Sequence, residues 1–238
     1  MINQFAVMLL AVAAPFYAQE NEAEKLIRLM EKEIAHAKGL KVSAETTYYL
    51  GGEVVKNKGA VQFGTQNKAR LVFEGPDLVG RPSHLLIVSD GKQMHIQSRP
   101  EEKPTLEPTP KNLSKCLGEV LVRGGLAMAS NIVENQMLET FDLDKELAMS
   151  GFKMGAKEKI GNVEAQIIEY KMKFRSGPAD FTLWIDPKTH LPLKRQLLND
   201  KGFKMIETYS EFVITPNLDP SIFELPKASE KKKPKKGD

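Results

Sequence analysis

The sequence predicts an α+β protein that is mainly β, in which helices cover one long antiparallel sheet of about ten strands. Three observations lead to this prediction. Apolar residues recur at every second position in many short segments, tight turns join most of these segments, and helical periodicity is confined to residues 21–38 and 110–149. Successive strands joined by tight turns form antiparallel meanders, and the apolar face of such a sheet needs a cover.

Residues 21–38 predict one amphipathic helix at the start of the folded chain. Apolar residues recur along one side at helical spacing, and charged residues occupy the other side. Gly39 is a typical signal for the end of a helix. The period then changes to two, which predicts a first block of strands. These strands are expected at residues 42–50, 53–64, 68–75, 84–89 and 92–98.

Two turns in this first block carry specific signals. Gly51-Gly52 and Asp90-Gly91 are dipeptides typical of two-residue hairpin loops. With Asp90-Gly91 as the loop, residue 89 faces residue 92, and His84 faces position 97. The position opposite His84 is then two residues from His95 on the neighbouring strand, and a metal site there would still need a third ligand. Ordinary surface histidines are therefore expected.

Prolines and helical periodicity set the middle of the chain apart. Residues 99–110 contain four prolines, which predicts an extended connector. Thr109-Pro110 then predicts the start of a helix, with the threonine as N-cap. Residues 110–149 predict two or three short helices outside the sheet, with an interruption at Gly124-Gly125.

A second block of strands follows residue 150. Alternation is clearest after residue 163, and Ser176-Gly177-Pro178 and Asp186-Pro187 mark two of the turns. Asp219-Pro220 predicts a last helical turn. The strands are expected near residues 152–160, 163–175, 181–185, 191–199 and 203–215.

The two ends of the chain are expected to lie outside the domain, which covers residues 20–226. Residues 5–18 are almost wholly apolar but too short to span a bilayer comfortably. This pattern favours a signal peptide over residues 1–19, with an uncleaved N-terminal anchor as the alternative. Residues 227–238 hold six lysines against two acidic residues, which predicts a disordered tail. The alternative is an arm that attracts anionic membrane or polymer.

Composition and motifs exclude several classes of protein. The net charge is +3, and because the tail carries +4 the other 226 residues carry −1, so no nucleic-acid partner is expected. Cys116 is the single cysteine, which excludes an intrachain disulfide and a multi-cysteine zinc cluster. Nucleophile-elbow, paired-histidine and phosphate-loop motifs are absent from the sequence. We therefore expect no enzyme, no catalytic residues, no cofactor and no metal.

Four features occur in order along residues 20–226. They are the exported N-terminus with its helix, the hairpin Val88-Ser89-Asp90-Gly91-Lys92, the string Leu183-Trp184-Ile185-Asp186-Pro187-Lys188-Thr189 with Leu191-Pro192, and the closing Asp219-Pro220-Ser221-Ile222-Phe223 with Leu225-Pro226. This set resembles the bacterial outer-membrane lipoprotein carrier superfamily, the LolA/LolB-like proteins, including periplasmic relatives of the envelope-stress sensor type. The resemblance implies an incomplete antiparallel β-barrel of about 10–11 strands wrapped around the N-terminal helix and a helical lid at residues 110–149.

The resemblance also implies a function and a site. The chain is expected to be an exported carrier that holds lipid or lipoprotein acyl chains in an apolar cavity under the lid. The alternative is an envelope sensor or adaptor that binds a membrane-protein segment. Plain core packing is the competing role for every candidate cavity residue. The candidates for the cavity and lid are Leu117, Leu121, Met128, Ile132, Val133, Met137 and Trp184.

One departure from the family concerns the lid. The carriers place an Arg-Pro pair at the start of the third strand, where the arginine ties the lid down, and this chain has none. Lys68 and Arg70 share a face of that strand and are the candidates for a lid-tethering contact. The expected partners are lipid or lipoprotein acyl chains and membrane-anchored donor or acceptor proteins. The protein is expected to be a monomer of the periplasm or cell envelope, soluble after signal cleavage.

Overall fold

A computed structural model describes residues 21–76, 82–99, 101–134, 142–174, 177–215 and 217–226. The expected signal peptide and the lysine-rich tail lie outside these residues, as does Met137. The described strands are β1 (Gly39–Leu50), β2 (Glu53–Gly64), β3 (Lys68–Pro76), β4 (Pro82–Asp90), β5 (Gln93–Gln97), β6 (Thr105–Pro108), β7 (Met149–Ile160), β8 (Val163–Phe174), β9 (Gly177–Ile185), β10 (Pro192–Asn199) and β11 (Lys204–Ile214).

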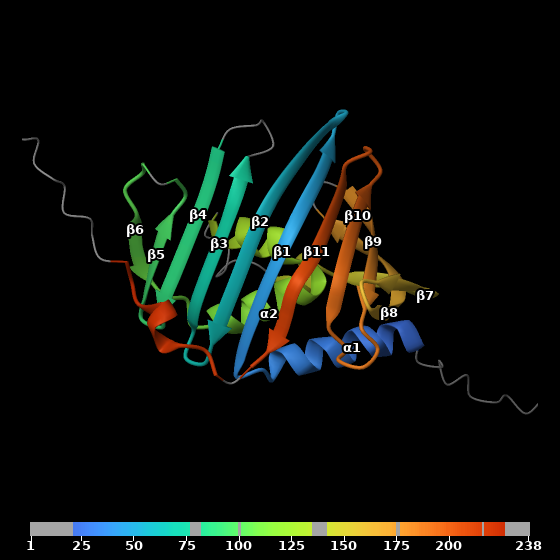
Figure 1. Cartoon of the computed structure of the whole chain (residues 1–238), viewed down its shortest axis with the longest axis horizontal. Coiled ribbons are helices and arrows are strands. Elements are labelled where there is room, and N and C mark those ends of the chain that lie inside the picture. Colours follow the sequence, from blue (N-terminus) through green and yellow to red (C-terminus); the bar gives the residue numbers. More distant parts are fainter. Residues whose placement is uncertain are drawn as a thin grey trace, which may run out of the picture.

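All eleven strands form one antiparallel sheet, in the order β6-β5-β4-β3-β2-β1-β11-β10-β9-β8-β7 (Figure 1). The first and last strands, β1 and β11, pair at its centre and join the two meanders. The edge strands β6 and β7 do not pair with each other, so the sheet curves without closing. The predicted mainly-β fold with an incomplete antiparallel barrel is therefore confirmed.

The helices lie against one face of this sheet, here called the inner face. They are α1 (Glu22–Ala35), α2 (Leu113–Arg123), α3 (Leu126–Glu134) and the short α4 (Leu143–Glu146). Figure 1 shows α1 and α2 behind the sheet, across the lower half of the strands. The Asn21 side chain caps α1 by accepting from the Ala23 amide (2.9 Å), and it donates to the Phe152 carbonyl of β7 (2.7 Å). This residue therefore fixes the start of the helix on the sheet.

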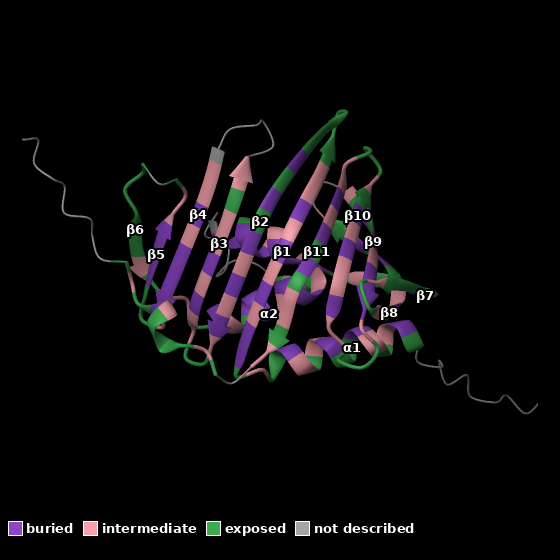
Figure 2. Ribbon diagram, viewed as in Figure 1, coloured by how far each residue is buried: buried purple, intermediate pink, exposed green. Residues whose placement is uncertain are grey.

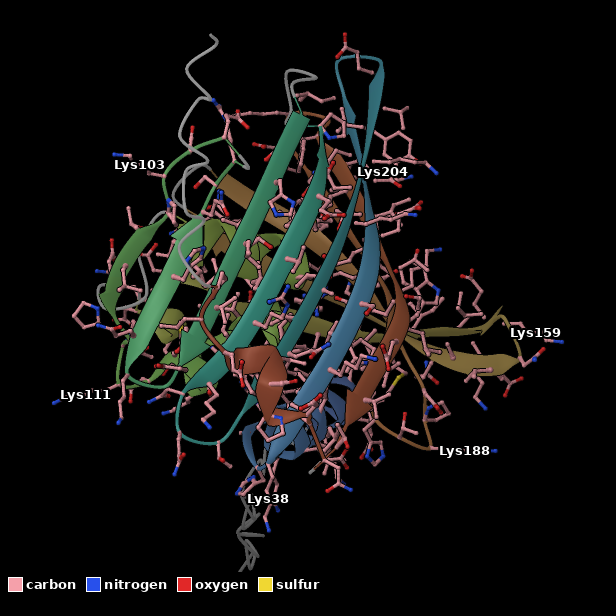
Figure 3. All side chains as sticks on the ribbon, turned by 60° about the vertical axis from the view of Figure 1, so that its left-hand side comes forward. Lys38, Lys103, Lys111, Lys159, Lys188 and Lys204 are labelled. Carbon is pink, nitrogen blue, oxygen red and sulfur yellow. The ribbon has the colours of Figure 1, made fainter. Side chains whose placement is uncertain are left out.

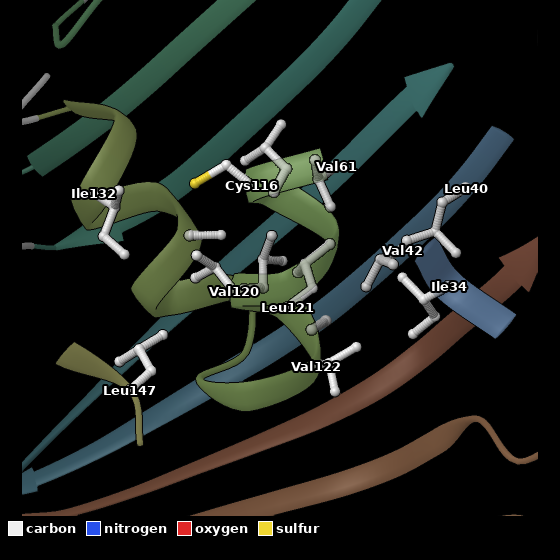
Figure 4. Close-up of a cluster of buried hydrophobic side chains, with 14 of the residues drawn as sticks. Ile34, Leu40, Val42, Val61, Cys116, Val120, Leu121, Val122, Ile132 and Leu147 are labelled. Carbon is white, nitrogen blue, oxygen red and sulfur yellow. The ribbon is translucent and has the colours of Figure 1, made fainter. Parts of the chain in front are cut away.

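The core lies between the helices and the inner face. Buried and more exposed residues alternate along most strands, as a sheet with one covered face requires (Figure 2). Ile27 and Met30 of α1 are fully buried, as are Leu40 and Val42 of β1. Figure 4 shows how side chains of α2 meet those of β1 and β2 in this cluster. One core therefore serves both strand blocks.

Two expectations about the middle of the chain are wrong. The segment 99–110 contains β6, a four-residue edge strand that pairs with β5. Such a short strand ending in Pro108 has too little alternation to be recognised from the sequence. Thr109 does not cap α2, because its hydroxyl is hydrogen-bonded to that of Ser89 (2.8 Å) and the helix begins at Leu113.

The register of the β4–β5 hairpin also differs from the expectation. Ser89 pairs with Met94, so the two-residue loop is Gly91-Lys92 rather than Asp90-Gly91. The Asp90 carboxylate accepts from the backbone amides of Gln93 (2.8 Å) and Lys92 (2.7 Å), and these bonds lower the pKa of Asp90. This local turn moves the register by two positions, and Leu86 rather than His84 faces position 97. The final helical turn is confirmed as a 3₁₀ turn, η1 (Pro220–Phe223).

A tight corner joins α2 to α3 at Gly124 and Gly125. Gly125 has φ +88°, a left-handed conformation that favours glycine. A Cβ atom there would lie 2.5 Å from Glu207 Oε1 and 3.0 Å from Arg195 Nη1. Position 125 therefore requires glycine for two reasons, namely its backbone conformation and the close approach of two strand side chains.

We expect Gly125→Ala to destabilise the protein more than Gly161→Ala, which changes a left-handed glycine (φ +58°) with open space around its missing Cβ. Both variants force alanine into the left-handed region, at a cost of about 1–2 kcal/mol. Only Gly125→Ala also crowds buried groups, which adds about 1–3 kcal/mol. Urea unfolding of the two variants measures the difference. Equal losses would show that the corner is not crowded.

Candidate functional site

A cavity of about 400 Å³ lies between α3 and the inner face of the sheet. Its volume falls within the range of about 300–1,000 Å³ found for small-molecule pockets. Helix α3 forms one wall, through Ala127, Met128, Ser130 and Asn131. The opposite wall comes from six strands and the turn before β11. The residues of that wall are Tyr48, Asn57, Phe73, Ser83, Leu85, Leu197, Phe203 and Met205.

Strand register brings the apolar part of this wall together. Met205 of β11 pairs with Tyr48 of β1 on one side and with Leu197 of β10 on the other. Because paired residues point to the same face of a sheet, these three side chains lie in a row. The Phe203 ring lies against Tyr48, with 6.2 Å between the ring centres. Residues that are far apart in the chain therefore form one continuous apolar surface.

The cavity is apolar with a polar margin. Among the described residues that line it, none is charged. Four of them are polar, namely Asn57, Ser83, Ser130 and Asn131, and they come from β2, β4 and α3. The Ser130 hydroxyl donates to the Leu126 carbonyl (2.9 Å). Such a surface suits a ligand that is mostly hydrocarbon with an uncharged polar group.

A cluster of buried polar side chains, here called the polar cluster, fastens the helical corner to the sheet. It consists of Thr46, Tyr170, Arg195, Glu207 and Tyr209 on the inner face. Arg195 and Glu207 are fully buried and pair across β10 and β11. Thr46 donates to Glu207 Oε2 (3.4 Å), and the Tyr209 hydroxyl donates to Glu207 Oε1. Hydrogen bonds thus join Thr46, Tyr209 and Glu207, whereas Nε and Nη1 of Arg195 have no hydrogen-bond partner among the described residues.

Four hydrogen bonds run from the polar cluster to the backbone of α2 and α3. Glu207 accepts from the amides of Leu126 (2.9 Å) and Ala127 (3.0 Å) at the start of α3. Arg195 donates to the Val122 carbonyl (2.6 Å) and Tyr170 to the Arg123 carbonyl (3.0 Å) at the end of α2. A carboxylate at a helix N-terminus and a guanidinium at a C-terminus both match the helix dipole.

Burial sets the protonation of the tyrosines in this cluster. Burial raises the pKa of Tyr209 well above its usual value, against the charge of Arg195 and with the charge of Glu207. Burial also raises the pKa of Tyr170. Both phenols therefore keep the protons that they donate in hydrogen bonds. On the opposite side of the corner, Arg123 of α2 binds Glu31 of α1 (3.2 Å) and Asp144 of α4 (2.9 Å).

The structure brings one of the candidate cavity residues, Met128, into the lining. The four candidates Leu117, Leu121, Ile132 and Val133 are at most 3% exposed and pack in the core, where Figure 4 shows Leu121 and Ile132. Each belongs to a helix at the site without lining the cavity. Met137 lies outside the described residues.

Trp184 lies on the opposite face of the sheet from the cavity. It alternates with Leu183 and Ile185, which belong to the core. Its indole N–H donates to Glu158 (2.8 Å), and the Lys194 ammonium lies 4.1 Å from the ring centre. These partners occupy both the edge and the face of the ring, and the residue is not brought to the cavity.

Lys68 and Arg70 also lie away from the helices. On β3 they alternate with Ala69 and Leu71, which are buried in the core. The contacts that hold α2 and α3 come from Arg195, Glu207 and Tyr170. At the start of α2, the Asn67 side chain also donates to the Lys111 carbonyl (2.7 Å). A signal for two of the three strand residues was present in the sequence. Arg195 lies in phase with the apolar Leu197, and Glu207 lies between Met205 and Tyr209, so both charges point to the apolar face.

Titratable side chains outside the polar cluster are distributed over several separate parts of the described chain. Among those residues, no group of three or more histidine, cysteine or acidic side chains could hold a metal ion. The lysines labelled in Figure 3 point outwards from separate parts of the surface. Cys116 is buried, and burial raises the pKa of its thiol to about 11. None of the described helices is both long enough and apolar enough to cross a membrane.

Comparison with known proteins identifies a family match. The family described as "Predicted periplasmic protein (DUF2092)" matches residues 23–233. No curated protein matches the chain.

Several solved structures are similar at low sequence identity. MucB shares 15% identity with a TM-score of 0.46 over 87% of this chain, which spans only 63% of MucB. LprF from Mycobacterium bovis shares 11% identity with a TM-score of 0.47, over 82% of this chain and 96% of that one. A LolA superfamily protein from Nitrosomonas europaea shares 12% identity with a TM-score of 0.32, over 85% and 97% of the two chains. The solved structures to which this chain is similar thus include a member of the LolA superfamily, the group that the sequence resembles.

We expect Glu207→Gln to lower the free energy of unfolding by about 3–5 kcal/mol, because it leaves the buried Arg195 charge without its partner. The matched control is Glu211→Gln on the same strand, where the carboxylate forms a surface ion pair with Lys41 (3.0 Å). The control should change stability by less than about 1 kcal/mol. Urea unfolding measures both. Similar losses in the two variants would contradict a structural role for the polar cluster.

The polar cluster also predicts a loss of stability in alkali. Tyrosines with a raised pKa in the folded protein stay protonated there, whereas unfolded tyrosines lose their protons above about pH 10. The contribution of these tyrosines to the free energy of unfolding should therefore be fully present below this pH and be lost as the pH rises above it. Tyr170→Phe should make this loss less steep. Unfolding curves measured across this range test the slope, and an unchanged slope in the variant would exclude Tyr170 as its source.

Proposed function

Because this chain belongs to the DUF2092 family of predicted periplasmic proteins, we propose that it is an exported binding protein that carries the acyl chain of a lipid or lipoprotein. In this proposal residues 1–19 act as a signal peptide, with an uncleaved N-terminal anchor as the alternative. Residues 20–226 form the binding domain, and the lysine-rich residues 227–238 follow it.

The observation that carries the proposal is the uncharged cavity under α3. The cavity of about 400 Å³ is open to solvent, and its lining is mostly apolar. Tyr48, Phe73, Met128 and Phe203 line it and remain half-buried, so solvent reaches apolar surface that a ligand would cover. Covering this surface is a favourable step that needs no charged contact.

The energetics favour a hydrocarbon chain as that ligand. Each buried methylene contributes about 0.8 kcal/mol, so about ten methylenes supply the roughly 8 kcal/mol of micromolar binding without any catalytic group. A polar head would be left at the margin formed by Asn57, Ser83, Ser130 and Asn131. A flexible methionine in the wall suits chains of differing shape. Function then consists of shielding the chain from water between a donor and an acceptor.

The test compares two alanine-to-phenylalanine variants. Ala127→Phe places a ring inside the cavity, whereas Ala156→Phe adds the same ring at an exposed site on β7. We expect wild type and Ala156→Phe to bind a saturated monoacylglycerol, detected by native mass spectrometry and by displacement of N-phenylnaphthylamine. Ala127→Phe should bind at least about tenfold more weakly. A delipidated wild-type protein that binds neither compound would refute the proposal.

The alternative role, a sensor or adaptor for a membrane-protein segment, has a separate outcome. Purification from the native envelope would then recover one membrane protein in a fixed ratio and no lipid. A bound lipid mass, lost in Ala127→Phe and kept in Ala156→Phe, would support the carrier.

A further inference from the structure

A second cavity of about 200 Å³ adjoins the first. Three side chains line both, namely Met128, Leu197 and Phe203. Beyond them the second cavity is lined by residues of β8, β9 and the β10–β11 turn. These residues are Phe174, Gly177, Pro178, Ala179, Asn199 and Asp200. The two spaces are therefore separated by side chains and not by backbone.

The three shared side chains differ in burial and in their place in the fold. Leu197 is 7% exposed and sits in the middle of β10, paired with Phe181 and Met205. Met128 and Phe203 are half-buried. Met128 has an unbranched side chain with several rotatable bonds, and Phe203 belongs to the turn that follows β10 rather than to a strand. A change of rotamer at either costs about 1 kcal/mol.

We propose that Met128 and Phe203 form a movable partition, and that a single unbranched acyl chain displaces it and runs from the first cavity into the second. The partition then sets which chain lengths the protein binds well. This inference rests on the proposed function and adds the ligand class to it. Short chains fill the first cavity alone, and long chains need both.

The charges around the two cavities specify the head group. Among the described residues that line either cavity, Asp200 is the only charged one, and it stands at the outer end of the second. A negative head would be repelled by Asp200 and would find no cationic partner among the described residues of either lining. The uncharged margin of the first cavity offers hydroxyl and amide groups instead. The ligand is therefore a single-chain amphiphile with an uncharged polar head.

The decisive experiment measures affinity against chain length, with saturated monoacylglycerols as the ligands. In the wild type, each added methylene should tighten binding about fourfold. This increase should continue for chains that are longer than the first cavity. Ala179→Leu places extra carbon atoms in the second cavity only. This variant should bind short chains as the wild type does, within about twofold. Its affinity should stop increasing with chain length once the chain fills the first cavity.

A second pair of variants tests the partition and guards against misfolding of Ala179→Leu. Met128→Ala removes one half of the partition, and Met154→Ala removes an exposed methionine of β7 that is 45% accessible. In the wild type, a long chain must displace the Met128 side chain, which costs free energy. Met128→Ala removes this cost and should raise the ratio of long-chain to short-chain affinity about threefold or more. Met154→Ala should leave that ratio unchanged.

The outcomes separate this inference from the proposed function. If Ala179→Leu follows the wild-type curve at every length, or if Met128→Ala leaves the affinity ratio unchanged, the two cavities are not one site and the inference is overturned. If the wild type binds short and long chains equally, the second cavity takes no chain, and the inference fails while the carrier function stands. If it binds no chain of any length, the proposed function itself fails.

Discussion

A buried carboxylate, that of Glu207, decides where the helices sit on the sheet. It accepts the first two amides of α3 while Arg195, its cross-strand partner, holds the last turn of α2. Removing one charge from such a pair leaves the other uncompensated in a low-dielectric interior, at a cost of about 3–5 kcal/mol. The corner at Gly125 is consequently fixed within hydrogen-bond distance of two particular strands. Everything α3 contributes to the cavity is placed by this constraint.

The same constraint explains why the cavity stays open. Apolar surfaces normally pack together until their atoms are in van der Waals contact, and atoms that face an empty space lack the dispersion attraction of those contacts. Here α1 and α2 fill the inner face at one end of the strands, and the polar cluster fixes the first turn of α3 at hydrogen-bond length from β11. Helix α3 cannot sink onto Tyr48 and Met205 without breaking those bonds. The polar cluster therefore holds an apolar cavity open.

The fold was readable from the sequence, whereas the site was only partly so. Period-two patterning and turn residues predict ten of the eleven strands, because each is a local signal. The short β6 and the β4–β5 register depend on the Asp90 turn and on pairing with neighbours, which periodicity does not report. Most of the candidate cavity residues lie on helical apolar stripes. Such stripes mark the buried side of a helix, so they found Leu117 and Leu121 in the core and only Met128 at the cavity.

The residues of the polar cluster show what sequence reasoning could still have found. A charge in phase with apolar neighbours on a strand, as at Arg195 and Glu207, must be buried and paired. Their partners were out of reach, because Val122, Leu126 and Ala127 meet them through backbone atoms that carry no sequence signal. Lys68 and Arg70 are the basic residues nearest to the place of the carriers' lid-tethering arginine, and period two places both on the face away from the helices.

The route of a ligand into the cavity follows from comparing two costs. Lifting the helical lid as a unit would break at least seven hydrogen bonds, because Asn67 and Ser114 also join the start of α2 to the sheet. It would also separate two buried groups of opposite charge from their surroundings, at a cost of at least about 3–5 kcal/mol. Rotating the half-buried side chains of Met128 and Phe203 costs about 1 kcal/mol each. Two to three buried methylenes offset the second cost but not the first. A chain therefore enters by moving side chains at the cavity, while the helices remain fastened to the sheet.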